Sequence, residues 1–209
     1  ITAALTNIFT FQQNYQFEDK TMKSDLKNIL AKNPIIASLC RESDLDDLCL
    51  SNVRIAFILY GDLQSLPSIA SRIKKANILP FIHIDFIDGL SAKEAAVDFI
   101  KYYTCAAGIV TTKNAQIKRA RTLELYCIQR FFVFDAISQN NIRTQIAACN
   151  ADAIEILPGV IPSVIRDLSS DCRLPFITGG FINSQKEVET ALHCGASNIT
   201  TSIPNLWFT

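Results

Sequence analysis

The chain has 209 residues, 49% of them hydrophobic, which is enough to bury the core of one globular domain. Its 20 lysines and arginines balance its 20 aspartates and glutamates, so nucleic-acid binding would need a local basic patch, because the molecule as a whole carries no net charge. No apolar run has the length of a membrane span and no signal-peptide pattern opens the chain, so we expect a cytoplasmic protein without a membrane partner.

The chain begins with a segment that has no clear hydrophobic period. Residues 1–21 precede Met22, the only methionine, after which Leu26, Ile29 and Leu30 fall at helical spacing. We expect residues 1–21 to be a leader or a non-native extension and residues 22–209 to form a single domain. A first helix is predicted over Met22–Lys32.

Eight short apolar runs follow at regular spacing, separated by segments with helical periodicity. Strands that alternate with helices predict a parallel sheet, and eight units predict a compact (β/α)8 barrel of the TIM type. The alternative is an open doubly wound sheet, although no GxGxxG motif follows the first run. The runs are Pro34–Cys40, Val53–Leu59, Phe81–Ile87, Ala106–Thr111, Leu125–Phe134, Ala153–Leu157, Leu174–Thr178 and Ala196–Thr201.

The last unit is short, because only a few residues follow the eighth run. We therefore expect a vestigial last helix at about Asn205–Phe208. The Met22–Lys32 helix is predicted either to take the place of the missing helix or to plug the bottom of the barrel.

Charged residues interrupt several of these apolar runs near their ends, where barrel proteins place their sites. A buried charge is costly unless it is paired, so these residues are expected to bind a ligand, the alternative being a structural ion-pair network. His83 shares the predicted strand face of Asp85 and is expected to be a core histidine. The candidate ligand residues of this group are Asp85, Lys113, Arg130 and Glu155.

A phosphate site is predicted in the loops after the seventh and eighth runs. Glycines let backbone N–H groups approach an anion, and hydroxyls on the next loop add donors. Barrels often bind phosphate in these two loops, although a Gly-Gly pair can also be a simple tight turn. The candidates are Thr178, Gly179, Gly180, Thr201 and Ser202, and Gly159, which follows the sixth run, is a further ligand-binding candidate.

Other kinds of site have little support in the sequence. The seven cysteines are scattered without CxxC spacing, which predicts reduced thiols and neither disulfides nor a metal site. We expect no cofactor and no catalytic group. Lys118, Arg119 and Arg121 on the predicted fourth helix are either a solvated helix face or a patch that contacts RNA phosphates.

Several collinear motifs together resemble the glycerol-3-phosphate-responsive antiterminator family. The resemblance runs from about Lys32 to Trp207. The motifs are Asn33-Pro34-Ile35-Ile36-Ala37, Tyr60-Gly61-Asp62, His83-Ile84-Asp85-Phe86-Ile87-Asp88-Gly89-Leu90, Gly108-Ile109-Val110-Thr111-Thr112-Lys113, Ile128-Gln129-Arg130-Phe131-Phe132, Glu155-Ile156-Leu157-Pro158-Gly159, Thr178-Gly179-Gly180 and Thr200-Thr201-Ser202.

The resemblance implies a small (β/α)8 barrel that binds sn-glycerol 3-phosphate in its mouth. It also implies binding of the leader mRNA of a glycerol operon, so that transcription passes a terminator. The alternative is a phosphate-binding barrel enzyme acting on a small phosphorylated substrate, with Asp85 or Glu155 as the base and Lys113 as the electrophile. Whether the chain forms a homodimer is left open by the sequence.

Overall fold

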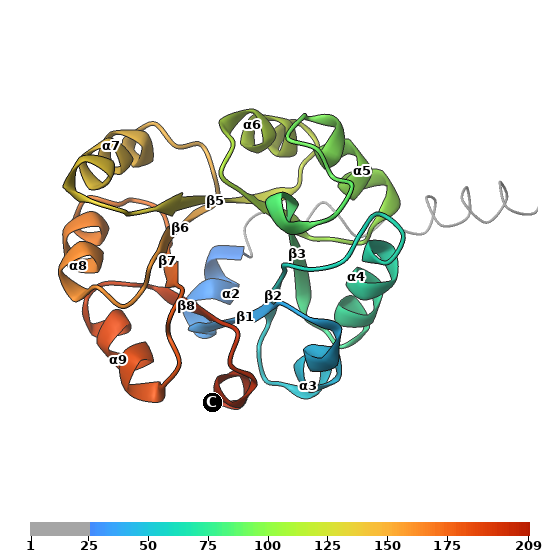
Figure 1. The fold of residues 1–209 in the computed structure, drawn as a ribbon, viewed down its shortest axis with the longest axis horizontal. Helices are drawn as coiled ribbons and strands as arrows, with labels where there is room; N and C mark the ends of the chain where they lie inside the picture. The colour runs from blue at the N-terminus through green and yellow to red at the C-terminus, as the bar shows by residue number, and fades with distance from the viewer. Residues whose placement is uncertain (1–25) are drawn as a thin grey trace, which may run out of the picture.

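The computed structural model describes residues 26–209 and shows a closed barrel of eight parallel strands in the order β1 to β8. Helices surround the barrel, which confirms the predicted fold class (Figure 1). The strands are β1 Ile35–Leu39, β2 Ile55–Ile58, β3 Leu79–His83, β4 Gly108–Thr111, β5 Tyr126–Phe132, β6 Ala153–Leu157, β7 Phe176–Gly179 and β8 Asn198–Thr201.

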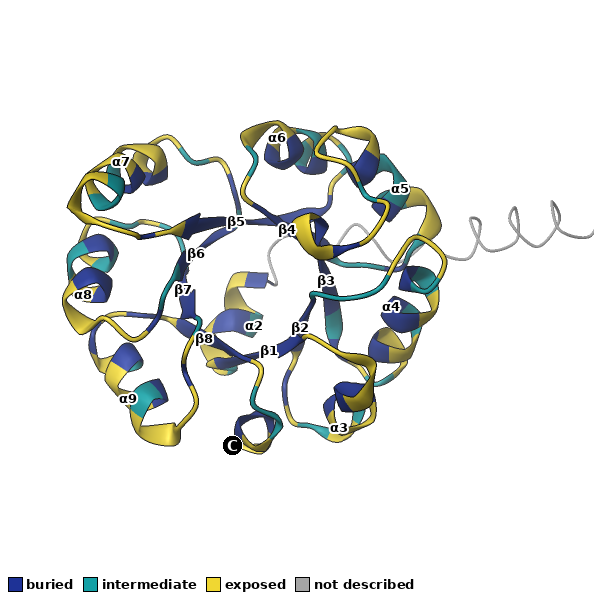
Figure 2. Cartoon of the chain, in the orientation of Figure 1, coloured by how far each residue is buried: buried dark blue, intermediate teal, exposed yellow. Residues whose placement is uncertain are grey.

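Each crossover between strands holds a helix that buries apolar residues against the barrel, and Figure 2 shows the buried sides of these helices facing the strands. These are α3 Leu45–Leu50, α4 Leu66–Lys75, α5 Ala95–Tyr103, α6 Asn114–Thr122, α7 Ala136–Ala147, α8 Pro162–Ser170 and α9 Gln185–His193. Short 3-10 turns, η1 Glu42–Asp44 and η2 Ile84–Phe86, follow β1 and β3. The third strand therefore ends at His83, earlier than predicted, and Asp85 lies in a turn and not on the strand.

The strands separate two hydrophobic cores, because successive side chains point to opposite faces. One core lies between the strands and the helices and contains, for example, Ile154 and Ile156 of β6. The other fills the barrel and contains Ile36, Phe57 and Phe81. Since both faces of every strand are covered, the strands are nearly continuous hydrophobic runs.

Helix α2, Leu26–Lys32, closes the bottom of the barrel. Its buried Leu26 and Leu30 belong to the internal core, and the Asn198 side chain of β8 donates hydrogen bonds to the carbonyls of Leu30 and Asn33. Of the two predicted roles for this segment, the plug is the one that the structure shows. The predicted start of the helix at Met22 and the leader over residues 1–21 lie outside the described residues.

The C-terminal 3-10 helix η3, Pro204–Phe208, occupies the place of the eighth helix, between α9 and α3 (Figure 1). Trp207 is fully buried there, and its indole Nε1 donates to the Thr201 carbonyl at 2.9 Å. The Asn52 N–H donates to the Trp207 carbonyl and ties this turn to the segment before β2. The predicted vestigial last helix is thus present, and it packs on the outside of the barrel like the crossover helices.

All seven cysteines lie in the described range and are free thiols. Burial raises the pKa of the Cys127 thiol to about 12, so this sulfur is protonated and unreactive near neutral pH. Within residues 26–209, no helix is both long and apolar enough to cross a membrane.

Candidate ligand site at the barrel mouth

The interior side chains of the barrel stack in layers, each contributed by alternate strands. The strand register pairs Arg130 with Glu155, Glu155 with Ile177, and Gly179 with Thr200. Because the strands are tilted, residues at the same height in the barrel are shifted along the register from one strand to the next. When the register of all eight strand pairs is followed with this shift, two layers of four inward-facing residues lie near the mouth. The lower layer holds Phe57, Val110, Glu155 and Thr200. The upper layer holds Ser38, His83, Arg130 and Gly179.

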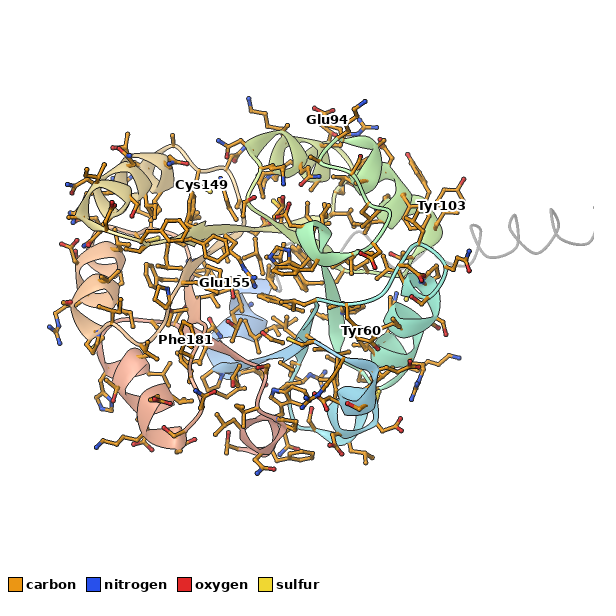
Figure 3. The ribbon with its side chains drawn as sticks, viewed as in Figure 1. Tyr60, Glu94, Tyr103, Cys149, Glu155 and Phe181 are labelled. Atoms are coloured by element: carbon orange, nitrogen blue, oxygen red, sulfur yellow. The ribbon has the colours of Figure 1, made fainter. Side chains whose placement is uncertain are left out.

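An ion pair inside the barrel forms the floor of the mouth. Arg130 Nε lies 2.6 Å from Glu155 Oε2, and the two side chains are 4% and 0% exposed. Thr200 Oγ1 donates to the second carboxylate oxygen, Glu155 Oε1, at 2.7 Å. Figure 3 shows Glu155 near the centre of the barrel. The hydrogen-bond donors and acceptors of this network have fixed positions, because each side chain is held by a rigid strand and by a partner.

His83 stands in the same upper layer and has both ring nitrogens buried. Neither nitrogen has a hydrogen-bond partner among the described residues, and the nearest acid, Asp85, lies 3.9 Å from Nδ1. Burial and the neighbouring Arg130 charge lower the pKa of His83 to about 3, so the imidazole is neutral near pH 7. Two buried polar atoms without hydrogen bonds lower the stability of the fold unless a ligand or a water molecule hydrogen-bonds to them.

Asp85 and Lys113 meet at the rim on the β3–β4 side. The Asp85 carboxylate accepts hydrogen bonds from Lys113 Nζ and, at 3.2 Å, from the Thr112 N–H. Burial alone would raise the pKa of Asp85, but these hydrogen bonds outweigh it and lower the pKa. Lys113 therefore already has a carboxylate partner, which makes it a positioned positive charge and does not favour an amine nucleophile.

The turn after β7 has free backbone donors above this floor. Gly180 and Phe181 have positive φ angles of 78° and 62°, so consecutive N–H groups turn toward one side. The N–H groups of Gly180, Phe181 and Ser202 have no acceptor in the described part of the chain. A Cβ on Gly179 would lie 1.8 Å from Thr200 Oγ1, so only glycine leaves room for the hydroxyl that reaches Glu155. The turn can thus hold an anion with backbone donors.

Three of the predicted ligand-binding residues make other contacts. The hydroxyls of Thr178 and Thr201 point outward from the barrel and donate to the carbonyls of Ile156 and Ile182. The Gly159 N–H donates to the Gly179 carbonyl at 2.5 Å. These residues support the loops, and the structure does not bring their donors into the mouth.

The mouth is hollowed on the β5 side and rimmed by exposed aromatic rings. A cavity of about 290 Å³ opens there between β5 and α7, lined by residues that include Thr112, Arg130, Phe132 and Ser138. Phe132 and Phe134 stack with ring centroids 6.0 Å apart. Arg130 therefore borders a space large enough for a small polar molecule.

The basic residues predicted on the fourth helix, α6, are mostly paired. Arg119 contacts Asp98 on α5, and Arg121 lies 2.8 Å from Asp152. Lys118 is exposed. Two of the three positive charges are thus already balanced by acids, which weakens the case for α6 as an RNA surface.

The site includes residues that the sequence did not single out as ligand contacts: His83, Ser38 and Thr200. A signal was present for all three. Ser38 and His83 each lie two residues after an interior apolar residue, Ile36 and Phe81, and Thr200 lies two residues before the candidate Ser202. These residues come together because they lie in neighbouring layers of the barrel. The layers depend on how far each strand is shifted relative to the next, and no single stretch of sequence contains that information. No group of three or more metal-ligating side chains occurs among residues 26–209.

Comparison with known proteins gives one consistent picture. A model of the family described as glycerol-3-phosphate responsive antiterminator matches residues 35–207. The chain is 35% identical over 182 residues to the uncharacterised Escherichia coli (strain K12) protein YgcP, covering 87% of this chain and 95% of that protein.

Solved structures agree. The glycerol uptake operon antiterminator regulatory protein of Listeria monocytogenes is similar with a TM-score of 0.78 and 26% identity, over 83% of this chain and 94% of that one. A related Thermotoga maritima protein gives 0.74 and 27%, over 84% and 98%. The deoxyribose phosphate aldolase of Aeropyrum pernix, at 15% identity and a TM-score of 0.65 over 87% and 89%, shares the fold alone. The chain belongs to the glycerol-3-phosphate-responsive antiterminator family.

Proposed function

We propose that this chain senses sn-glycerol 3-phosphate in the barrel mouth and, when liganded, binds the leader mRNA of a glycerol operon and allows transcription to pass a terminator. Family membership supports the regulatory role. The observation that carries the ligand proposal is the polar floor of Ser38, His83, Arg130 and Glu155 directly beneath a turn with free backbone donors.

In the proposed complex, the two ends of the ligand use different parts of the mouth. The phosphate lies on the N–H groups of Gly180 and Ser202, with the charges of Lys113 and Arg130 opposite its dianion. The glycerol hydroxyls hydrogen-bond to Glu155 and to the neutral His83 ring, which can both donate and accept. Asp85 holds Lys113 in place. Ligand binding orders the mouth loops, and the difference in affinity between the two states links metabolite to RNA.

A sensor and an enzyme are distinguished by the fate of the ligand. We expect the phosphorus NMR signal of sn-glycerol 3-phosphate to shift or broaden with the protein and to give no new species over hours, whereas inorganic phosphate binds more weakly. New phosphorus resonances would instead support the barrel enzyme. An unperturbed signal would exclude the ligand. Retention of the leader RNA on a filter only in the presence of sn-glycerol 3-phosphate tests the second half of the proposal.

Two neighbouring threonines on β8 provide a matched test of the binding mode. Thr200→Val removes the hydroxyl that holds Glu155 and should weaken ligand binding roughly tenfold, because one buried carboxylate oxygen loses its donor. Thr201→Val removes a hydroxyl outside the barrel that donates to the Ile182 carbonyl and accepts from the Ile203 N–H, and should cost about 2 kcal/mol of stability while leaving affinity nearly unchanged. Isothermal titration calorimetry and thermal melts measure both. Equal loss of affinity in the two variants would contradict the assigned faces.

A further inference from the structure

The two ends of the barrel differ in charge, although the whole chain is neutral. Loops that follow the strands form the mouth, and loops that precede them form the base. The mouth loops are mainly acidic, with Glu42, Asp44, Asp62, Asp85, Asp88, Glu94, Asp135 and Glu187 against Arg41, Lys93, Lys113 and Lys186. The base is mainly basic, with Lys27, Lys32, Arg54, Lys74, Lys75, Lys101, Arg121 and Arg173 against Glu124, Asp152 and Asp171.

The basic residues at the base gather where β2, β3 and β4 begin. The Leu79 N–H of β3 donates to the Arg54 carbonyl at 2.8 Å, so Arg54 lies beside the start of the third strand. Burial raises the pKa of the Cys105 thiol, just before β4, and the charges of Lys74 and Lys75 at the end of α4 partly oppose that rise. These two charges therefore lie near the end of α5. Adjacent strands therefore bring these side chains onto one edge of the base.

Two exposed tyrosines lie at the end of α5, just before Cys105 in the chain. Tyr102 and Tyr103 are 54% and 59% exposed, and Tyr103 stacks on Phe99 with ring centroids 5.3 Å apart. Figure 3 shows Tyr103 at the outer edge of the barrel beside α5. A rigid exposed ring next to positive charges can stack an unpaired base while the cations contact the phosphates.

Basic residues are unevenly distributed among the helix ends at the base, and Lys74, Lys75 and Lys101 lie in the last turns of α4 and α5. Cations at helix C-termini are favourable in general, yet α3, α7 and α8 have no basic residue in their last turns. At α6, Arg119 and Arg121 are paired with acids, and Lys118 is exposed. Basic side chains at the base are most numerous at the end of α4, and others lie at the end of α5 and on the plug helix α2.

We propose that this basal face, formed by Arg54, Lys74, Lys75, Lys101, Tyr102 and Tyr103, is the surface that contacts the RNA. The inference rests on the proposed function and assigns its second partner to the end of the barrel opposite the ligand. The acidic mouth would repel the RNA backbone, whereas the base attracts it. Leu26 and Leu30 of α2 link the two ends, because they pack on the internal core beneath the ligand layers.

Charge reversal at the base tests the surface against a control with the same change in net charge. The test variant is Arg54→Glu/Lys75→Glu, and the control at the mouth rim is Lys93→Glu/Lys186→Glu. All four side chains are exposed. In the presence of sn-glycerol 3-phosphate, leader-RNA affinity of the basal variant should fall at least ~10-fold, and the slope of log K against log salt should decrease by roughly 1.4 for two lost contacts to a single strand. Tyr103→Ala should weaken binding several-fold with an unchanged salt slope.

The outcomes separate the surface from the function it serves. Calorimetry of sn-glycerol 3-phosphate binding should be unchanged in the basal variant, which shows that it is folded. If the wild type retains RNA and both double variants bind equally, or the rim variant alone loses affinity, the surface is wrong and the antiterminator function stands. If the wild type retains no leader RNA with ligand, both proposals fail. Retention of anionic lipid vesicles by the base in place of RNA would also overturn the assignment.

Discussion

Glu155→Ala is expected to lower the free energy of unfolding by about 3–5 kcal/mol, because it leaves the Arg130 guanidinium buried without its partner. The Thr200 hydroxyl would lose its acceptor in the same change. Urea denaturation followed by circular dichroism measures the loss. Binding of sn-glycerol 3-phosphate should disappear as well, since the variant removes the acceptor for the ligand hydroxyls and frees the floor to move.

Replacing both members of the ion pair separates these two effects. Glu155→Leu/Arg130→Met removes both charges and fills a similar volume, so most of the stability should return, as it often does when a buried pair becomes hydrophobic. Ligand binding should not return. If the double variant bound sn-glycerol 3-phosphate, the ion pair would be only a structural network, which was the alternative interpretation of these charges in the sequence.

The barrel could be predicted from the sequence because each of its eight units carries the same local signal. The predicted apolar run and the observed strand β6 have the same bounds, Ala153–Leu157, and this run is bounded on both sides by polar or turn residues. At β3 the run continued to Ile87 although the strand ends at His83. Ile84 and Ile87 belong to the 3-10 turn and its end, and both are buried in the outer core. Buried residues in a turn therefore gave the same apolar pattern as a strand would.

The site was predictable in part, and the limit has a physical cause. Arg130 and Glu155 were recognisable because a charge inside an apolar run needs a partner. Which of Thr200, Thr201 and Thr178 faces the mouth depends on where the strand period starts, and a shift of one residue reverses every side chain. The pairing of Arg119 and Arg121 depends on acids 21 and 31 residues away, which no local pattern contains.

His83 is expected to lower stability in acid, and its removal to abolish that loss. The folded protein keeps the pKa of His83 near 3, below the ordinary value of 6.5, so the unfolded chain binds a proton first as the pH falls. Stability is therefore complete above about pH 6.5 and falls by about 1.4 kcal/mol per pH unit below it. Between pH 7 and 5 the wild type should lose about 2 kcal/mol. The hydrogen bonds from Lys113 and Thr112 keep the pKa of the neighbouring Asp85 below its usual value, so Asp85 titrates below this window.

His83→Leu should remove this pH-dependent loss, and should leave the ligand-free protein as stable as the wild type or more stable, because two buried ring nitrogens no longer lack partners. The same variant should bind sn-glycerol 3-phosphate about tenfold more weakly, since it cannot hydrogen-bond to the glycerol. His83→Gln, which keeps a donor and an acceptor, should recover part of the affinity. A gain in stability joined to a loss of binding is the pattern expected of a residue retained for its ligand. Unchanged affinity in His83→Leu would instead identify an ordinary core histidine.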